Sequence, residues 1–356
     1  MSHSRSTGLK CGDMVASGHN NAGITARQVE CRHYERDGDR VRCLLCAQAC
    51  VIGPSKVGFC RVRMNVDGRL MLTTYGACSS VHVDPIEKKP LFHFHPGSQI
   101  LSLGSLGCNL SCRFCQNWQI SQSSTPTRYI SPEEAAKTAL ELPGSIGIAY
   151  TYNEPLVWYE YIMDTARSVR DAGLKNVLVT NGEINEEPLR ELLPLVDAMN
   201  IDVKSMEEEF YRSLSKGKLA PVLRTVEVAR EFGCHIEVTN LVIPGSNDRP
   251  DQIERLVNWL ASMDQTIPLH LSRYHPDYEM TAPPTPAETL IAARDMALKQ
   301  LRYVYVGNIY IPGAEDTYCP GCGAVVVQRM GFSIVDMQLN DSGGCASCGA
   351  AVDIIS

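Results

Sequence analysis

Between residues 99 and 312, short apolar stretches alternate with longer stretches in which apolar residues recur at helical spacing. A capping box, Ser131-Pro132-Glu133-Glu134, predicts the start of one helix. Strands are predicted at 146–150, 176–180, 198–204, 235–243, 269–274 and 303–306, and helices at 155–172, 186–194, 219–232, 250–262 and 286–300. Repeated strand–helix units predict a parallel sheet. About six units, fewer than the eight of a closed barrel, favour an α/β fold with a partial (β/α)6 TIM-like barrel, and the pattern leaves open whether the strand at 303–306 extends it.

Composition divides the chain into four segments. Residues 1–29 are rich in small polar residues and lack apolar periodicity, which predicts a disordered tail. Residues 30–98 and 313–356 are cysteine-rich and flank the barrel at 99–312, so we expect an N-terminal metal-binding module and a C-terminal zinc-ribbon-like module. The chain has 15 cysteines, mostly in short-range clusters, which favours metal centres over disulfides in a reducing compartment.

Charge and hydropathy narrow the possible partners. The net charge of −7 disfavours nucleic-acid binding dominated by phosphate contacts. No apolar run approaches the roughly 20 residues that span a bilayer, and the N-terminus has no secretory apolar region. We therefore expect a cytoplasmic protein and no membrane or nucleic-acid partner.

A CxxxCxxC triplet, Cys108, Cys112 and Cys115, directly follows an apolar, strand-like segment. Soft thiolates select iron–sulfur clusters or zinc, and three of them can hold three irons of a cubane while the fourth stays open. A structural zinc site would need a fourth ligand nearby, whereas the next cysteine is Cys234. The triplet therefore predicts chemistry at an open iron, with a zinc knuckle or simply buried cysteines as the alternative.

An earlier cluster comprises Cys43, Cys46, Cys50 and Cys60, which are spaced closely enough to close a tetrahedral site. Zinc and a [4Fe–4S] cluster both fit, and the spacing does not choose between them. Both a metal that staples the fold and an electron-relaying cluster remain open.

Two CxxC knuckles near the C-terminus predict a zinc ribbon, because a glycine after each second cysteine lets backbone N–H groups turn toward the sulfurs. Their ligands are Cys319, Cys322, Cys345 and Cys348. We expect a structural tetrahedral zinc. Only one basic residue, Arg329, follows Cys322, which again disfavours nucleic-acid binding.

Polar residues end or follow several predicted strands, where β/α barrels carry their catalytic and binding groups. They are Glu154, Asn181, Asp202, Lys204, Asn240, His270, Arg273, Tyr274 and His275. Each has an ordinary structural explanation: Glu154 could cap a helix, Asp202 and Lys204 could form an ion pair, and a lone histidine is more often structural. Their convergence on one face with the cysteine loop favours an active site.

Residues 84–309 resemble the radical S-adenosylmethionine (SAM) superfamily, in the branch related to pyruvate formate-lyase-activating enzyme. The shared motifs are the CxxxCxxC triplet, Asp202-Val203-Lys204 and Val242-Ile243-Pro244-Gly245, whereas Tyr152-Asn153-Glu154 replaces a Gly-Gly-Glu type motif and keeps its acid. With its flanks, the chain is similar to the radical SAM enzyme of the AmmeMemoRadiSam system. The similarity covers the N-terminal cysteines, residues 84–91, Cys115-Gln116-Asn117-Trp118, Tyr152-Asn153-Glu154-Pro155 and the C-terminal cysteine pairs.

The resemblance implies two cofactors: a [4Fe–4S] cluster on Cys108, Cys112 and Cys115, and SAM, whose amino and carboxylate groups chelate the open iron. It places Phe114 near the adenine of SAM and Glu154, Asn181, Asp202 and Lys204 around its amino acid and ribose. Asn240 and His275 complete the predicted cofactor-binding set. Candidate substrate contacts are Gln116, Asn117, Trp118, His270, Arg273, Tyr274, His275 and residues 84–89, in which Lys88 and Lys89 are interpreted as a solvated charge pair.

By this resemblance the protein is an enzyme that reductively cleaves SAM to a 5′-deoxyadenosyl radical, which abstracts hydrogen from an unidentified metabolite or cofactor precursor. A glycyl-radical activase acting on a partner protein and a non-catalytic metal-binding interaction protein are the alternatives. Catalysis would require a one-electron donor of flavodoxin or ferredoxin type. We expect one of the metal modules to cover part of the barrel mouth if the substrate is small, and a wide opening if it is a protein.

Overall fold

The computed structural model describes residues 26–356, in which an eight-stranded sheet forms the centre of the fold. Its strands lie in the order β16-β15-β14-β13-β12-β11-β9-β8. Their bounds are β8 Ser80–Pro85, β9 Gln99–Gly104, β11 Ser145–Tyr150, β12 Lys175–Thr180, β13 Ala198–Asp202, β14 His235–Val242, β15 Leu269–Arg273 and β16 Val304–Gly307. β8 is antiparallel to β9, and the other neighbours pair in parallel. The predicted partial barrel is confirmed, and β16 extends it.

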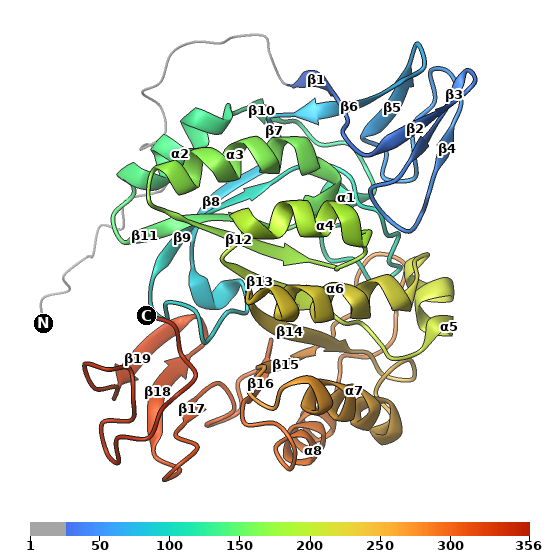
Figure 1. Ribbon diagram of the computed structural model, residues 1–356. Helices are drawn as coiled ribbons and strands as arrows, with labels where there is room; N and C mark the ends of the chain where they lie inside the picture. The colour runs from blue at the N-terminus through green and yellow to red at the C-terminus, as the bar shows by residue number, and fades with distance from the viewer. Residues whose placement is uncertain (1–25) are drawn as a thin grey trace, which may run out of the picture.

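Helices cover the outer face of this sheet (Figure 1). Their bounds are α1 Trp118–Ser121, α2 Pro132–Glu141, α3 Tyr159–Asp171, α4 Glu186–Leu192, α5 Glu208–Phe210, α6 Leu219–Phe232, α7 Pro250–Met263 and α8 Ala287–Ala297. The predicted start of α2 is confirmed, since Ser131 Oγ accepts a hydrogen bond from Glu134 N at 3.2 Å. Within residues 26–356, no helix combines the length and apolar character needed to cross a membrane.

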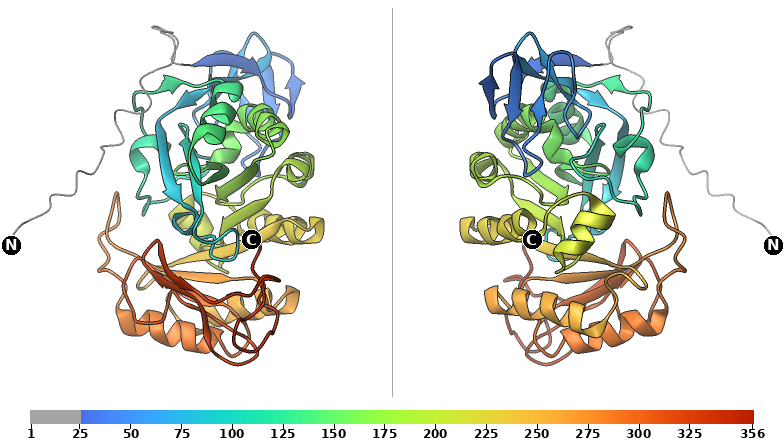
Figure 2. Two further views of the ribbon diagram at one scale, coloured as in Figure 1. Left: turned by 90° about the vertical axis from the view of Figure 1, so that its left-hand side faces the viewer. Right: turned by 90° about the vertical axis from the view of Figure 1, so that its right-hand side faces the viewer.

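Small antiparallel sheets flank the barrel. The N-terminal strands are β1 Arg27–Glu30, β2 Tyr34–Asp37, β3 Arg40–Cys43, β4 Val51–Ile52, β5 Arg63–Val66 and β6 Arg69–Tyr75; β7 Ala77–Cys78 pairs with β10 Arg128–Tyr129. The C-terminal sheet contains β17 Thr317–Tyr318, β18 Val325–Met330 and β19 Ser333–Met337. Figures 1 and 2 show the N-terminal and C-terminal sheets at opposite ends of the large sheet.

The predicted segment boundaries can be located on this fold. Residues 1–25 of the predicted tail lie outside the described residues, and the remainder of that segment leads into β1, which pairs with β6. The predicted division at residues 98 and 99 falls between β8 and β9, which are neighbours in one sheet. The division of the chain into modules stays a prediction.

The barrel interior is closed at the amino ends of its strands by a buried polar cluster. The Glu237 carboxylate accepts a hydrogen bond from His93 N at 2.7 Å and lies 2.6 Å from His270 Nε2. His93 Nε2 in turn lies 2.5 Å from the hydroxyl of Tyr305 on β16. Because buried polar groups need partners, this cluster fixes the lower layer of the barrel. This layer fills the barrel interior below the carboxyl ends of β14, β15 and β16.

Candidate active site

A cavity of about 250 Å³ opens at the carboxyl ends of the parallel strands. Its wall comes from loops that follow β9, β11, β12, β13 and β16 and from the ends of β14 and β15. The loop between β9 and α1 contributes Cys108, Cys112 and Cys115 to this wall. The three sulfur-bearing residues of the triplet therefore share one cavity, at the end of the barrel where such folds carry their chemistry.

Hydrogen-bond donors point at the sulfur of Cys108. The backbone N–H of Leu110 donates to Cys108 Sγ at 3.3 Å, and the Nδ2 group of Asn181, which also lines the cavity, donates at 3.6 Å. Cys115 Sγ lies 3.1 Å from the hydroxyl of Ser121. Donors of this kind stabilise a metal-bound thiolate and orient it.

Burial raises the pKa values of the Cys108 and Cys112 thiols. It raises the pKa of the Cys112 thiol to about 11, against the lowering effect of Lys204. A metal that binds thiolate must displace that proton, and binding is then coupled to proton release. Soft donors around one cavity, with polar hydrogens that donate to the sulfur of Cys108, fit an iron–sulfur cluster.

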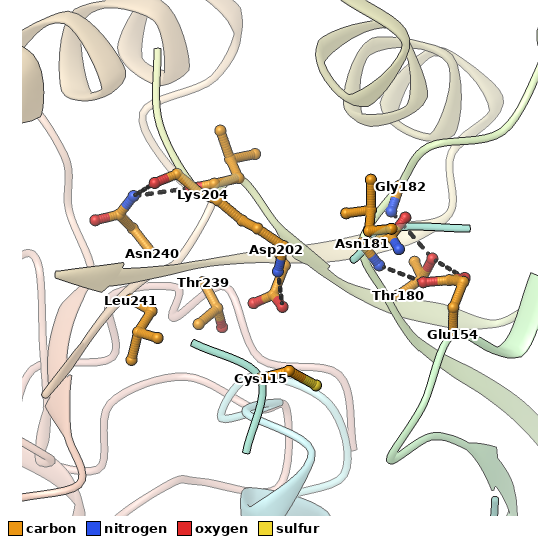
Figure 3. A network of polar contacts seen from close by, with 12 residues as sticks. Cys115, Glu154, Thr180, Asn181, Gly182, Asp202, Lys204, Thr239, Asn240 and Leu241 are labelled. Atoms are coloured by element: carbon orange, nitrogen blue, oxygen red, sulfur yellow. Dashed lines mark hydrogen bonds and ion pairs between the residues drawn. The ribbon is translucent and has the colours of Figure 1, made fainter. Parts of the chain in front are cut away.

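Asp202 and Lys204 form an ion pair on the cavity wall. Asp202 ends β13, and its Oδ2 lies 2.8 Å from Lys204 Nζ (Figure 3). Burial lowers the pKa of Lys204, but the Asp202 carboxylate outweighs that effect, so the pKa lies above its ordinary value. The Asp202 side chain is 39% exposed and that of Lys204 only 11%. Asp202 is therefore the more accessible of the two for a ligand in the cavity.

Glu154 is held by three hydrogen bonds behind the cavity wall. Its Oε1 accepts from Leu156 N at 3.0 Å and from Thr180 Oγ1 at 2.7 Å, and its Oε2 accepts from Asn181 N at 2.7 Å (Figure 3). Burial raises the pKa of Glu154 to about 7, although the hydrogen bonds act in the opposite direction. The helix-capping alternative is thus present in the structure, and a direct contact with SAM stays a prediction.

Asn240 supports the wall from its outer side. Thr239 and Leu241 line the cavity, and Asn240 lies on the opposite side of β14 because successive strand residues alternate (Figure 3). The Asn240 Nδ2 group donates to the carbonyls of Val203 at 2.8 Å and Lys204 at 3.2 Å. The structure therefore places Asn240 where it fixes the Lys204 turn, and not among the residues that line the cavity.

Two comparisons with known proteins decide the family. The family model of the radical SAM superfamily matches residues 103–260. The uncharacterised protein MJ0808 of Methanocaldococcus jannaschii is 44% identical over 334 residues, which cover 92% of this chain and 99% of that protein. The chain belongs to the radical SAM superfamily.

More distant relatives match parts of this radical SAM protein. Pyruvate formate-lyase 1-activating enzyme of Escherichia coli K12 is 22% identical over 176 residues, covering 48% of this chain and 71% of that enzyme. A solved radical SAM methyltransferase from Sphaerobacter thermophilus aligns with a TM-score of 0.48 and 14% identity, covering 79% of this chain and 76% of that one. Membership of the superfamily implies a radical SAM enzyme with a [4Fe–4S] cluster and SAM as cofactors.

The loop of residues 274–286, between β15 and α8, lies across the cysteine loop. Its Glu279 N donates to the carbonyl of Arg113 at 2.9 Å, and the two side chains form an ion pair at 3.6 Å. The rings of Tyr278 and Trp118 stack at 5.3 Å with 17° between their planes. These contacts tie the loop to the edge of the cavity.

The other residues that were predicted to contact a ligand reach the cavity to different degrees. Phe114, Gln116 and Asn117 line it, and Phe114 is buried with its ring 5.8 Å from that of Phe210. His275 is exposed, with Nδ1 at 3.2 Å from Gln116 Nε2. Phe114 is thus placed for an apolar contact with a ligand, whereas His275 lies at the rim.

Three residues nominated for the substrate serve other contacts. His270 belongs to the buried cluster around Glu237. Arg273 Nε donates to the carbonyl of Thr285 at 2.9 Å, and Tyr274 N donates to Thr285 Oγ1 at the same distance. Among the described residues, the cavity wall includes Ser272 of β15 but not these three.

Two residues that line the cavity have unusual backbone conformations that the sequence pattern did not predict. Tyr152 has φ of 73° and Asn308 has φ of 62°, and both line the cavity. Positive φ is uncommon outside glycine and concentrates at functional sites. The position of Asn308, directly after β16, is the signal that could have identified it, because a strand was predicted at 303–306 and its place in the barrel was left open.

The interpretation of Lys88 and Lys89 as a solvated pair is wrong for Lys89. Lys89 is buried, and its Nζ lies 2.6 Å from Asp84 Oδ2, while Lys88 reaches Asp84 Oδ1 at 2.8 Å from an exposed position. The hydroxyl of Tyr152 donates to Asp84 at 2.5 Å. Burial raises the pKa of Asp84, but these three partners outweigh it and hold the pKa well below its usual range. The charges therefore brace Tyr152 from behind the cavity wall.

The four C-terminal cysteines form a compact site. Their sulfurs all lie within 4.8 Å of one another, with Cys319 and Cys348 at 3.6 Å and Cys322 and Cys345 at 3.8 Å. Four sulfurs about 2.3 Å from one tetrahedral zinc ion would stand roughly 3.8 Å apart. The set therefore has the dimensions of a single-ion site.

Proposed function

We propose that this radical SAM enzyme abstracts hydrogen from a small metabolite or cofactor precursor. The observation that carries the proposal is the loop of residues 274–286, which is tied across the cysteine loop by backbone, ionic and aromatic contacts. A mouth that this loop borders suits a small molecule better than a protein segment. The bordering element is this internal loop, whereas we expected a metal module to cover the mouth.

The size and lining of the cavity support the same proposal. Its volume of about 250 Å³ lies just below the range of roughly 300–1,000 Å³ that is usual for small-ligand pockets. A cluster and SAM would occupy much of this space. Gln116, Asn117, Ser272 and Asn308 offer uncharged polar groups that could orient a small substrate.

We assign the cofactor contacts as follows. Cys108, Cys112 and Cys115 hold the cluster, which together with SAM supplies one-electron cleavage and a 5′-deoxyadenosyl radical. Asp202 binds a cationic or hydroxyl group of SAM, and Lys204 holds the Asp202 carboxylate in place at 2.8 Å. Phe114 and Asn181 line the cavity and complete the assigned contacts, whereas Glu154, Asn240 and His275 of the predicted set lie outside its wall. The loop of residues 274–286 lies at the rim of the cavity and would limit the entry of water. A reactive intermediate requires this exclusion of water.

The finer family assignment is also a proposal. We infer that the chain is the radical SAM enzyme of the AmmeMemoRadiSam system, because both its flanking cysteine clusters accompany the barrel. We further propose zinc as the C-terminal metal, a flavodoxin-like or ferredoxin-like electron donor, and a cytoplasmic location, where a reducing environment keeps cysteine ligands available. A glycyl-radical activase is the second candidate, favoured only by the relatives named above.

The source of the abstracted hydrogen separates the two candidates. Cells grown on deuterated medium would be divided into a small-molecule fraction and a protein fraction, and each would be incubated anaerobically with the reduced enzyme and unlabelled SAM. Mass spectrometry of the 5′-deoxyadenosine should show deuterium from the small-molecule fraction, and none with the Cys108, Cys112 and Cys115 triple alanine variant. Deuterium arising only from the protein fraction would favour the activase.

A further inference from the structure

The four N-terminal cysteines line a second cavity, separate from the active site. Cys43, Cys46, Cys50 and Cys60 share its wall with the buried side chain of Arg63. The free volume is only about 20 Å³. A cluster of iron and inorganic sulfide therefore requires the four cysteine side chains to turn outward from the centre of this space.

The N-terminal set is not gathered around a single-ion site in the way that the C-terminal set is. Among the described residues, the group whose ligand atoms are placed to hold one metal ion is Cys319, Cys322, Cys345 and Cys348, with all four atoms within 4.8 Å of one another. The active-site triplet is likewise not gathered as a single-ion site, and membership of the radical SAM superfamily implies a cubane there. A cubane attaches each thiolate to a different iron and so needs wider spacing than one ion does.

One buried donor on a residue that lines the second cavity has no acceptor. Arg63 is 1% exposed, and its Nε has no hydrogen-bond partner among the described residues. The same guanidinium is bound through its other nitrogens to Glu160, so Nε is the donor left over. The backbone N–H of Phe59 donates to Cys50 Sγ at 3.3 Å. A buried donor without a partner, on a side chain that lines a cavity of cysteines, indicates an acceptor that the protein itself does not supply, as inorganic sulfide would be.

A single stretch of backbone, residues 108–110, separates the two cavities. Cys108 and Leu110 line the active site, whereas Asn109 between them lines the second cavity. Gln48, also on the second cavity, donates through Nε2 to the carbonyl of Asn109 at 2.9 Å. The cysteine loop of the active site is therefore in direct contact with the N-terminal cysteine segment.

We propose that Cys43, Cys46, Cys50 and Cys60 hold a second iron–sulfur cluster, of the [4Fe–4S] type, that delivers electrons to the active site. A reduced iron–sulfur or flavin protein gives the second cluster one electron, and the second cluster passes one electron to the active-site cluster. Each acceptor is reduced as its donor is oxidised, and no atom is transferred. Among the described residues, the active-site wall includes none of these four cysteines, so the substrate does not reach them. The metal assignment stands alone, whereas the role as a relay rests on the proposed function.

Metal analysis of the unchanged, anaerobically reconstituted protein gives the first test. We expect about eight irons and one zinc per chain, because two cubanes accompany one ribbon. About four irons with two zincs would overturn the proposal without any need for a variant. Removal of the half-buried pair, as Cys46→Ala with Cys50→Ala, should halve the iron and leave the zinc unchanged. The matched control is Cys234→Ala, a buried cysteine outside the metal sets, which should change neither.

SAM cleavage by the Cys46→Ala, Cys50→Ala variant then tests the relay. With dithionite, a small reductant, the rate should stay within about twofold of the parent, and the EPR signal of the active-site cluster should persist. With reduced ferredoxin as donor the rate should fall at least tenfold. An undiminished ferredoxin-driven rate would overturn the relay. Loss of the dithionite-driven rate in the parent itself would instead contradict the proposed function.

Discussion

Replacement of Glu160 by glutamine tests the contribution of a buried ion pair next to the N-terminal cysteines. The side chains of Arg63 and Glu160 are 1% and 6% exposed, and two hydrogen bonds of 2.6 and 3.2 Å join them. Glu160 Oε1 also accepts a hydrogen bond from Arg32 N at 3.1 Å. Because glutamine has nearly the same shape as glutamate, the substitution removes mainly the charge.

The expected loss of stability is large. Removing one member of a buried pair leaves the other charge uncompensated, which costs about 3–5 kcal/mol. With a urea dependence of about 3 kcal/mol per molar, the unfolding midpoint should fall by about 1 M or more. Replacing both partners by methionine should recover most of this loss, because a buried ion pair often contributes no more than apolar residues of similar volume.

Anaerobic urea titration followed by circular dichroism measures the effect on the metal-loaded protein. The matched control is Asp251→Asn, because Arg249 and Asp251 form an ion pair at 2.8 Å with side chains 63% and 58% exposed. Exposed pairs contribute little, so the control should keep the parent midpoint. Equal shifts in Glu160→Gln and Asp251→Asn, or no shift in either, would refute the reasoning.

Three further predictions concern the other sites. Cys322→Ser should lower the thermal midpoint and release the C-terminal metal while leaving the Kd for SAM unchanged, as calorimetry and metal analysis would show. The folded-state pKa of Glu154 is raised from 4.5 to about 7, so the folded protein binds a proton more tightly there than the unfolded chain does, and the free energy of unfolding should fall by about 3 kcal/mol as the pH rises through that window. The parent should therefore have a lower urea midpoint at pH 8 than at pH 5, and Glu154→Gln should lack this difference. An identical pH profile in the parent and the variant would count against the burial argument. Asp202→Asn should weaken SAM binding by about one to two decades, since charge-assisted bonds contribute roughly 1.5–3 kcal/mol. Ser272→Ala, in the part of the wall that β15 contributes, should leave the Kd for SAM unchanged, and equal Kd values for both variants would place SAM elsewhere.

Much of the fold could be predicted because local signals and the global pattern agree. The capping box at Ser131 marked the start of α2, and apolar strands followed by amphipathic helices indicated a parallel sheet. The antiparallel edge strand β8 was not predicted, since antiparallel pairing depends on contacts with β9 that no local period encodes. The pairing of β16 with β15 was likewise set by tertiary contacts.

The candidate site was predictable only to the level of strand ends. The cysteine spacing placed Cys108, Cys112 and Cys115 on one loop, and Asp202 and Lys204 do reach the cavity. Which side chain of a strand faces inward depends on its phase, and for β14 this selects Thr239 and Leu241 over Asn240. The sequence also could not predict how far along the barrel axis a given strand residue lies.

His270 illustrates the same limit of depth. It lies below the cavity against Glu237, whereas Ser272, two residues later on β15, reaches the wall. Residues spaced by two share a face of a strand, so the sequence could place both on the inner face but could not separate their layers. Lys89 shows a related limit, because its burial depends on Asp84 and Tyr152, which lie on other elements.

The central claim, that Cys108, Cys112 and Cys115 hold the cluster at which SAM is cleaved, is tested most directly by EPR of the reduced protein with and without SAM. The parent and the Cys46→Ala, Cys50→Ala variant should both show a [4Fe–4S] signal that changes when SAM is added, and both should form 5′-deoxyadenosine with dithionite. The triple alanine variant at Cys108, Cys112 and Cys115 should lose the SAM-sensitive signal and the product while its C-terminal metal remains. Undiminished reductive cleavage of SAM by the triple variant would contradict the account.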